Sequence, residues 1–222
     1  DAKPAANVDD LWLETTLLED CATGKLKIRL LLSGETENIT LHCAIEGLMD
    51  ERVMLTFDGK YHISPEFTFS NIQCWCHETP NLYHAVLTLT DPSGEVLEEI
   101  PYDIGFRRFE LKDGIMLLNG QRLVIHGVNR HEWNPGTGRA IGMEDMERAM
   151  ETFRRNHINA VRTCHYPNQT PWYHLCDQSG IYMMDETNLE SHGSWQKLGK
   201  IEPSWNVPGS LPQWKDCVLD RA

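Results

Sequence analysis

Three short segments of this 222-residue sequence combine imidazole, guanidinium and carboxylate side chains. Residues 129–132 read Asn-Arg-His-Glu, residues 162–165 read Arg-Thr-Cys-His, and residues 185–192 read Asp-Glu-Thr-Asn-Leu-Glu-Ser-His. Side chains of these types transfer protons, bind hydroxyl groups or hold metal ions near neutral pH. Any one segment alone could be a solvated loop. Their shared position, each at the end of an apolar run, predicts a common site.

The apolar runs before these segments predict three strands, at 122–126, 159–162 and 181–184. Helices are expected between them, at 142–157, where Met143, Met146, Met150 and Phe153 form one apolar stripe, and at 171–178. Strands that alternate with helices at short spacing predict parallel pairing with right-handed crossovers. In α/β barrels the residues just past the strand ends form the active site. The three segments are therefore expected at one rim of a barrel.

The first half of the chain has the alternating pattern of short strands instead. Turn residues separate seven expected strands, at 11–14, 25–30, 38–45, 53–57, 67–72, 83–90 and 96–100. This number in about 100 residues suits an immunoglobulin-like β-sandwich. A hairpin at 109–118, followed by the turn Asn119-Gly120, leads into the second half. We expect a sandwich domain at 1–108 and the N-terminal part of a truncated (β/α)8 TIM barrel at 109–222.

Composition narrows the possible partners. The formal net charge of −13 disfavours nucleic acids and anionic membranes, and no apolar run approaches the length of a membrane span. The start of the chain lacks the pattern of a secretory signal. The seven cysteines contain no Cys-x-x-Cys pair, so we expect reduced cysteines and a cytoplasmic protein.

Longer motifs resemble a known family. The segments Gly127-Val-Asn-Arg-His-Glu132, 159–168 (Asn-Ala-Val-Arg-Thr-Cys-His-Tyr-Pro-Asn) and 185–193 resemble the opening barrel strands of glycoside hydrolase family 2. The Glu-x-His-Gly of the third segment resembles the large bacterial β-galactosidases within that family. Trp75, Pro80-Asn-Leu-Tyr83 and Gly105-Phe-Arg-Arg108 resemble the sandwich domain that precedes the barrel. The resemblance covers nearly the whole chain.

The resemblance implies a fragment of an enzyme that hydrolyses terminal β-D-galactosides, such as lactose, with retention of configuration. His131 and His165 would bind galactosyl hydroxyls and stabilise the transition state. Arg162 would orient the nucleophilic carboxylate. Glu190 and His192 would ligate Mg²⁺, and the resemblance leaves a need for Na⁺ open. It also implies a homo-oligomeric whole enzyme.

The chain lacks the Gly-Asn-Glu segment that would carry the acid/base carboxyl in this family, and it ends before the nucleophile. We therefore expect the isolated chain to be inactive. Three strands of an intended eight leave an open edge, through which copies of the chain could associate.

Three alternatives stay open from the residues. The first is a non-catalytic carbohydrate-binding or scaffold module, and the second is another family 2 activity such as a β-glucuronidase. The third is a zinc site formed by His131, His165 and His192. The preferred aglycone and the oligomeric state are not indicated by the sequence.

Overall fold

The structure is a computed structural model, and it describes residues 4, 6–34, 38–190, 196–197, 200–201 and 212–221. The chain divides into two compact units, Asp1–Val124 and Ile125–Ala222, and each is described by itself. None of the helices in these described ranges is long and apolar enough to cross a membrane.

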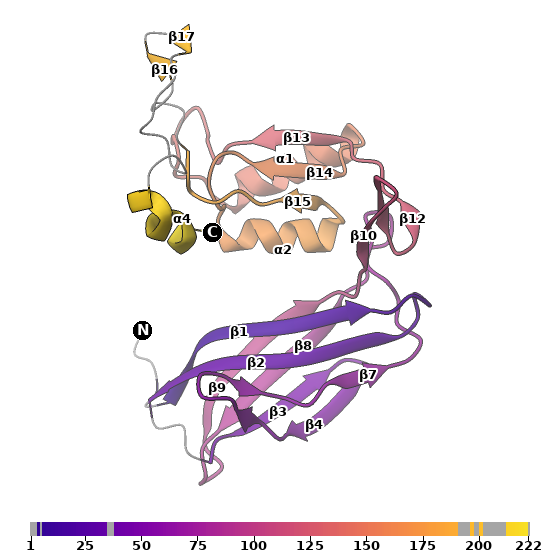
Figure 1. The fold of residues 1–222 in the computed structure, drawn as a ribbon, viewed down its shortest axis with the longest axis vertical. Helices are drawn as coiled ribbons and strands as arrows, with labels where there is room; N and C mark the ends of the chain where they lie inside the picture. Colours follow the sequence, from indigo (N-terminus) through magenta and orange to yellow (C-terminus); the bar gives the residue numbers. More distant parts are fainter. Residues whose placement is uncertain are drawn as a thin grey trace. The chain divides into compact units, whose positions relative to one another are not determined.

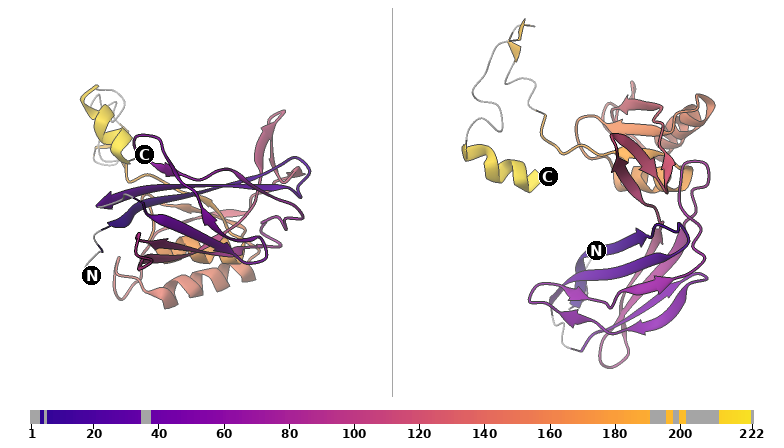
Figure 2. Two further views of the ribbon diagram at one scale, coloured as in Figure 1. Left: turned by 90° about the horizontal axis from the view of Figure 1, so that it is seen from below. Right: turned by 45° about the vertical axis from the view of Figure 1, so that its right-hand side comes forward.

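Residues 6–104 of the first unit form two antiparallel sheets (Figure 1). One sheet has the order β1-β2-β6-β5, with β7 also paired to β2, and the other has the order β4-β3-β8-β9. The strands are β1 (Ala6–Leu17), β2 (Gly24–Gly34), β3 (Thr40–Ile45), β4 (Met49–Val53), β5 (Thr56–Phe57), β6 (His62–Ile63), β7 (Phe67–Phe69), β8 (Tyr83–Thr90) and β9 (Val96–Ile104). Figure 2 shows the two sheets from other sides. The predicted β-sandwich is confirmed.

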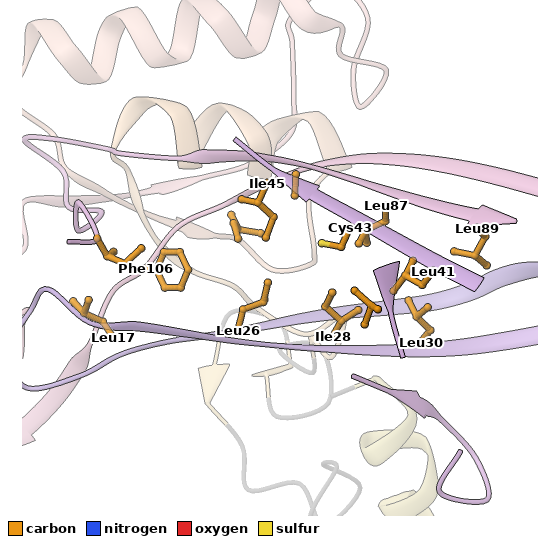
Figure 3. Packing of buried hydrophobic residues seen from close by; sticks show 14 residues of the cluster. Leu17, Leu26, Ile28, Leu30, Leu41, Cys43, Ile45, Leu87, Leu89 and Phe106 are labelled. Atoms are coloured by element: carbon orange, nitrogen blue, oxygen red, sulfur yellow. The ribbon is translucent and has the colours of Figure 1, made fainter. Parts of the chain in front are cut away.

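Alternate residues of the central strands form the core of the sandwich. Leu26, Ile28 and Leu30 of β2 are fully buried, because every second side chain of a strand points to the same face. They face Leu41 and Cys43 of β3 and the neighbouring residues of β8 (Figure 3). The two sheets are thus held together by one continuous apolar layer.

The predicted strand at 53–57 is wrong. Val53 ends β4 in one sheet, whereas Thr56 and Phe57 form β5 in the other sheet. The chain changes sheets between them, and the burial changes with it: Val53 is buried and Phe57 is 59% exposed. The apolar run in the sequence therefore covers a crossover rather than one strand.

A small sheet of β10 (Phe109–Lys112), β11 (Ile115–Leu118) and β12 (Gln121–Arg122) follows. The predicted hairpin is confirmed, as is the turn at Asn119-Gly120, where both residues have positive φ. The predicted strand at 122–126 is wrong. The first parallel strand is β13 (Gly127–Arg130), because pairing with the next strand begins only where Gly127 meets Ala160.

The second unit contains a parallel sheet of β13, β14 (Ala160–Thr163) and β15 (Tyr182–Met184). Helix α1 (Met143–Arg155) follows β13 and helix α2 (Thr170–Ser179) follows β14 (Figure 1). This confirms the predicted alternation of strands and helices.

The helices pack against the sheet through one apolar cluster: Ile141, Met146, Met150, Phe153, Val161, Trp172, Cys176 and Ile181 are its buried residues. Met143 does not belong to it, although the predicted stripe included it, because the first residue of α1 is 49% exposed. Helix α2 ends at its C-cap Gly180, whose φ of 70° suits glycine.

After β15 the structure describes the short strands β16 (Gln196–Lys197) and β17 (Lys200–Ile201), a 3₁₀ turn η1 (Pro212–Trp214) and helix α4 (Lys215–Arg221). Most of 193–212 lies outside the described residues.

Candidate active site

The three parallel strands end at the same edge of their sheet. β13 ends at Arg130, β14 at Thr163 and β15 at Met184, and adjacent strands pair in register. The residues that follow therefore meet, as the sequence predicted for a barrel rim. The shift in the first strand places Asn129 and Arg130 within β13 and leaves His131 and Glu132 just beyond it.

Arg162, His165 and Glu186 form the centre of this cluster. The Nη2 atom of Arg162 lies 2.8 Å from Oε2 of Glu186, and Nδ1 of His165 lies 3.0 Å from Oε1 of the same carboxylate. The contact to Oε2 is an ion pair without hydrogen-bond geometry, although this oxygen is buried. Arg162 Nη2 is also 3.2 Å from His165 Nδ1. All three side chains are part-buried, so their mutual attraction is screened less than at an open surface.

The two histidines assigned to sugar binding lie side by side. The rings of His131 and His165 have centroids 5.4 Å apart and cross at 78°, and the ring of Tyr166 lies 6.0 Å from that of His131. Nδ1 of His131 is 3.4 Å from the Tyr166 hydroxyl. Because these imidazoles come from different strand ends, they can contact different parts of one small ligand.

Glu190 joins the same cluster from the loop after β15. Its Oε2 lies 3.5 Å from Nδ1 of His165, and its side chain is 44% exposed. His192, the other predicted metal ligand, lies outside the described residues. The described part of the predicted metal site thus supplies one exposed carboxylate, and an oxygen donor of this kind is what Mg²⁺ prefers.

A buried polar network lies under the His131 segment. Arg130 Nη1 donates to Oδ1 of Asn168 at 2.6 Å and is 3.7 Å from Oε1 of Glu132. The Arg130 guanidinium also lies 3.6 Å from the ring centroid of Trp172, a cation–π contact. Burial lowers the pKa of Arg130 from its ordinary value, and the Glu132 carboxylate opposes that shift. The side chains of Arg130 and Glu132 are each only 10% exposed, so this pair holds the strand end rather than a ligand.

Asp185 ties the strand ends together. Its Oδ1 accepts hydrogen bonds from Thr163 Oγ1 at 3.0 Å and from the Tyr173 hydroxyl at 2.9 Å. Burial, reinforced by Asp185, raises the pKa of Tyr173 to about 12, so this hydroxyl stays protonated and donates. Hydrogen bonds of this kind give a side chain a structural role between strands. Asp185 has the contacts of that role, whereas Glu186 faces Arg162 and His165.

Cys164, His165 and Glu186 could also hold a metal ion, because their ligand atoms all lie within 4.8 Å of one another. The guanidinium of Arg162 already lies among them, with Nη1 3.3 Å from the Cys164 sulfur. A cation therefore has to displace another cation to bind there. The alternative zinc site predicted from His131, His165 and His192 includes a residue outside the described part of the chain.

Two residues of the cluster were missed from the sequence, Tyr166 and Glu186. Tyr166 lies in the quoted segment 159–168 and Glu186 in the quoted segment 185–193, but neither was given a role. Their contacts depend on how each loop turns after its strand, and residue spacing does not reveal that.

Comparison with known proteins gives two family matches. Residues 6–107 match the family described as glycosyl hydrolases family 2, and residues 109–222 match its TIM barrel domain. The fold class predicted from the sequence, a sandwich followed by the start of such a barrel, is therefore confirmed.

Curated relatives cover the whole chain. The chain is 48% identical to a β-galactosidase large subunit of Lactobacillus acidophilus and 46% identical to a β-galactosidase of Clostridium acetobutylicum. The chain spans 36% and 25% of the lengths of these two relatives.

Solved structures show the same fold. β-Glucuronidase 3 of Bacteroides uniformis matches with a TM-score of 0.71 at 29% identity, over 82% of this chain and 23% of that one. The β-glucuronidase of Parabacteroides merdae matches with a TM-score of 0.72 at 24% identity, over 81% of this chain and 23% of that one.

Proposed function

Because this chain belongs to family 2 of the glycosyl hydrolases, we propose that the protein of which it forms part hydrolyses terminal β-D-galactosides, such as lactose, with retention of configuration. The observation that carries the proposal is the meeting of His131, Arg162 and His165 at one sheet edge. The relatives named as β-galactosidases are 46–48% identical to the chain, whereas the solved β-glucuronidases described above are 24–29% identical. This difference favours the galactoside over the glucuronide.

In this proposal the imidazoles bind the sugar. His131 and His165 make hydrogen bonds to galactosyl hydroxyls, and these bonds strengthen as the ring flattens toward an oxocarbenium-like transition state. Interactions that are stronger in the transition state than in the bound substrate raise the rate of the chemical step.

Arg162 orients a carboxylate. Its guanidinium already binds the carboxylate of Glu186 at 2.8 Å, so it is placed to pair with an acid. Beside the nucleophile of the whole enzyme it favours the ionised form, because a nearby positive charge lowers the pKa of a carboxyl group.

The 222-residue chain by itself is proposed to be inactive. Retaining hydrolysis needs two carboxyl groups about 5–5.5 Å apart across the scissile bond. Glu132 is buried against Arg130, and Glu186 pairs with Arg162 and His165. Neither acid is free to attack a sugar or to protonate a leaving group. An isolated chain without activity also agrees with the alternative of a non-catalytic scaffold module. A scaffold role, however, gives no reason for the cluster of side chains at the strand ends.

Glu190 and His192 are proposed to hold Mg²⁺. The exposed carboxylate of Glu190 suits this ion, and when bound the ion supplies a positive charge beside the sugar site. Calorimetric titration of the whole protein with Mg²⁺ tests this, with Glu190→Gln as the variant. The variant is expected to weaken binding, and unchanged affinity would contradict the assignment. Whether Na⁺ is also used stays open.

We also propose a cytoplasmic, homo-oligomeric whole enzyme. All seven cysteines are free, which suits a reducing compartment. In the described residues β13 and β15 are the edges of the parallel sheet, and Met184 on β15 is 64% exposed. An exposed strand edge favours association, so the isolated chain is expected to self-associate. Light scattering of the purified chain tests this, and a strictly monomeric species would contradict it.

The experiment that tests the function compares the full-length protein on chromogenic β-galactosides and β-glucuronides, with Mg²⁺ present. Hydrolysis of the galactoside with initial release of the β-anomer, followed by NMR, is the expected result. Preference for the glucuronide would contradict the proposal and favour a β-glucuronidase. Initial release of the α-anomer would exclude retention of configuration. The isolated chain, prepared in a host without the enzyme, is expected to show only background turnover.

A further inference from the structure

The hydroxyl group of Tyr166 lies between two partners of the His131 segment. It is 3.2 Å from the backbone nitrogen of Glu132 and 3.4 Å from Nδ1 of His131. Neither contact was anticipated from the sequence, and the proposed roles of His131 and His165 do not explain why this tyrosine is present.

The two contacts differ in how far their hydrogen-bond direction is fixed. A backbone N–H can only donate, so the Tyr166 oxygen must accept from Glu132. The hydroxyl has a single hydrogen, and among the described contacts the partner that can accept it is Nδ1 of His131. In that arrangement Nδ1 is unprotonated, and the proton of the neutral imidazole is on Nε2.

The surroundings of Tyr166 keep its hydroxyl in place. The guanidinium of Arg139 lies 4.6 Å from the centroid of the Tyr166 ring. The backbone carbonyl oxygen of Tyr166 accepts a hydrogen bond from Nδ2 of Asn168 at 3.3 Å. Asn168 is buried, and its Oδ1 accepts a hydrogen bond from Arg130. The buried network under the strand end therefore fixes the residue that contacts His131.

The geometry points to Tyr166 as a positioning residue that holds His131 in the Nε2-protonated tautomer, so that this imidazole meets its ligand as a hydrogen-bond donor. The ligand atom it recognises is then an acceptor, which for a sugar is a hydroxyl or ring oxygen. This reading of the ligand rests on the proposed function, whereas the tautomer itself does not.

His165 has different surroundings. Its Nδ1 lies 3.0 Å from Oε1 of Glu186 and 3.5 Å from Oε2 of Glu190, with Arg162 Nη2 at 3.2 Å. No tyrosine hydroxyl is recorded at this nitrogen among the described contacts. His165 therefore serves as an internal reference, whose protonation pattern should not respond to the Tyr166 hydroxyl.

The test is NMR of the chain labelled with ¹⁵N in histidine, at about pH 8, above the ordinary imidazole pKa of about 6.5. Long-range ¹H–¹⁵N correlations distinguish a protonated ring nitrogen from an unprotonated one. His131→Gln and His165→Gln assign the two signals. We expect His131 to show an unprotonated Nδ1 and a protonated Nε2. A His131 protonated at Nδ1 overturns the proposal without any variant being needed.

Tyr166→Phe removes the hydroxyl and keeps the ring. The signals of the two His131 nitrogens are then expected to move toward each other, because both tautomers become populated, while the signals of His165 stay in place. Tyr83→Phe is the matched control: it deletes a hydroxyl of the sandwich that accepts from the backbone nitrogen of Gln73, and it should leave His131 unchanged. An unchanged His131 in Tyr166→Phe contradicts the proposal. These measurements need no substrate, so a protein that shows the tautomer but no galactosidase activity refutes the proposed function alone.

Discussion

The sandwich unit and the barrel unit both pair histidines with carboxylates, but they do so in different ways. In the sandwich, His84 lies 3.0 Å from Asp103 and His42 lies 3.0 Å from Asp50, in each case across two neighbouring antiparallel strands. In the barrel unit, Nδ1 of His165 lies within 3.5 Å of Glu186, Glu190 and Arg162.

The difference is one of topology. Antiparallel strands bring a histidine next to an acid on the solvent face, directly opposite for His84 and diagonally for His42, and both pairs stay partly exposed. Parallel strands end at one edge, so their loops bring together groups that are distant in the sequence. A histidine–carboxylate pair alone therefore does not indicate a site; several such groups from separate strand ends do.

The largest effect on stability is expected in the barrel unit, from Arg130→Met. This change removes the partner of the buried Glu132, and breaking a buried ion pair costs about 3–5 kcal/mol. Urea unfolding followed by circular dichroism measures it. The double variant Arg130→Met, Glu132→Leu should recover part of the loss. If the single variant unfolds like the wild type, the buried network is not what holds this strand end.

The sandwich should respond to a change in its apolar layer. Leu87→Ala removes a fully buried side chain of β8 and is expected to cost about 3 kcal/mol in the free energy of unfolding. Met54→Ala, at a side chain that is 80% exposed, is the matched control and should change it by less than about 0.5 kcal/mol. Equal effects of the two changes would contradict the assignment of the core.

Both units contain a buried thiol that should weaken them at alkaline pH. Burial raises the pKa of Cys43 to about 11 and that of Cys176 to about 12. In the unfolded chain these thiols ionise at lower pH, so the folded state binds more protons and stability falls as the pH rises above about 9. Cys176→Ala should flatten part of this decrease in a series of unfolding curves. A decrease of unchanged slope would mean that other groups cause it.

The smallest effect is expected from the exposed pair of the sandwich. His84→Gln removes the partner of Asp103, but the two side chains are 55% and 30% exposed. Such pairs contribute about 1 kcal/mol or less and are weakened by salt. A loss well above this value, measured by the same unfolding experiment, would remove the contrast between the two units.

The sequence predicted most of the fold because local periodicity is visible in it. The buried alternation of Leu26, Ile28 and Leu30 and the stripe of Met146, Met150 and Phe153 both follow from the spacing of apolar residues. The start of the first barrel strand could not be predicted in this way. The apolar run at 122–126 has a strand-like composition, but Arg122 pairs with β11, whereas Gly127 pairs with β14. Only the strands with which they pair show that Arg122 and Gly127 belong to different sheets.

The candidate site was predicted as a set of strand-end segments, and the described members meet. His131, Arg162, His165 and Glu190 form one chain of contacts. Tyr166 and Glu186 were given no role from the sequence, because their contacts with His131, Arg162 and His165 depend on how the chain turns after each strand. His192 lies outside the described residues, so its assignment stays a prediction.

The most direct measurement of the central claim compares His165→Ala with His84→Ala in the full-length protein, by kcat/KM on a chromogenic β-galactoside. His165 is expected to stabilise the transition state, so its loss should lower kcat/KM by a factor on the order of 10². His84→Ala, which removes an equally short carboxylate contact from the sandwich, should leave it within about twofold of the wild type. A His165→Ala enzyme as active as the His84→Ala enzyme would contradict the account.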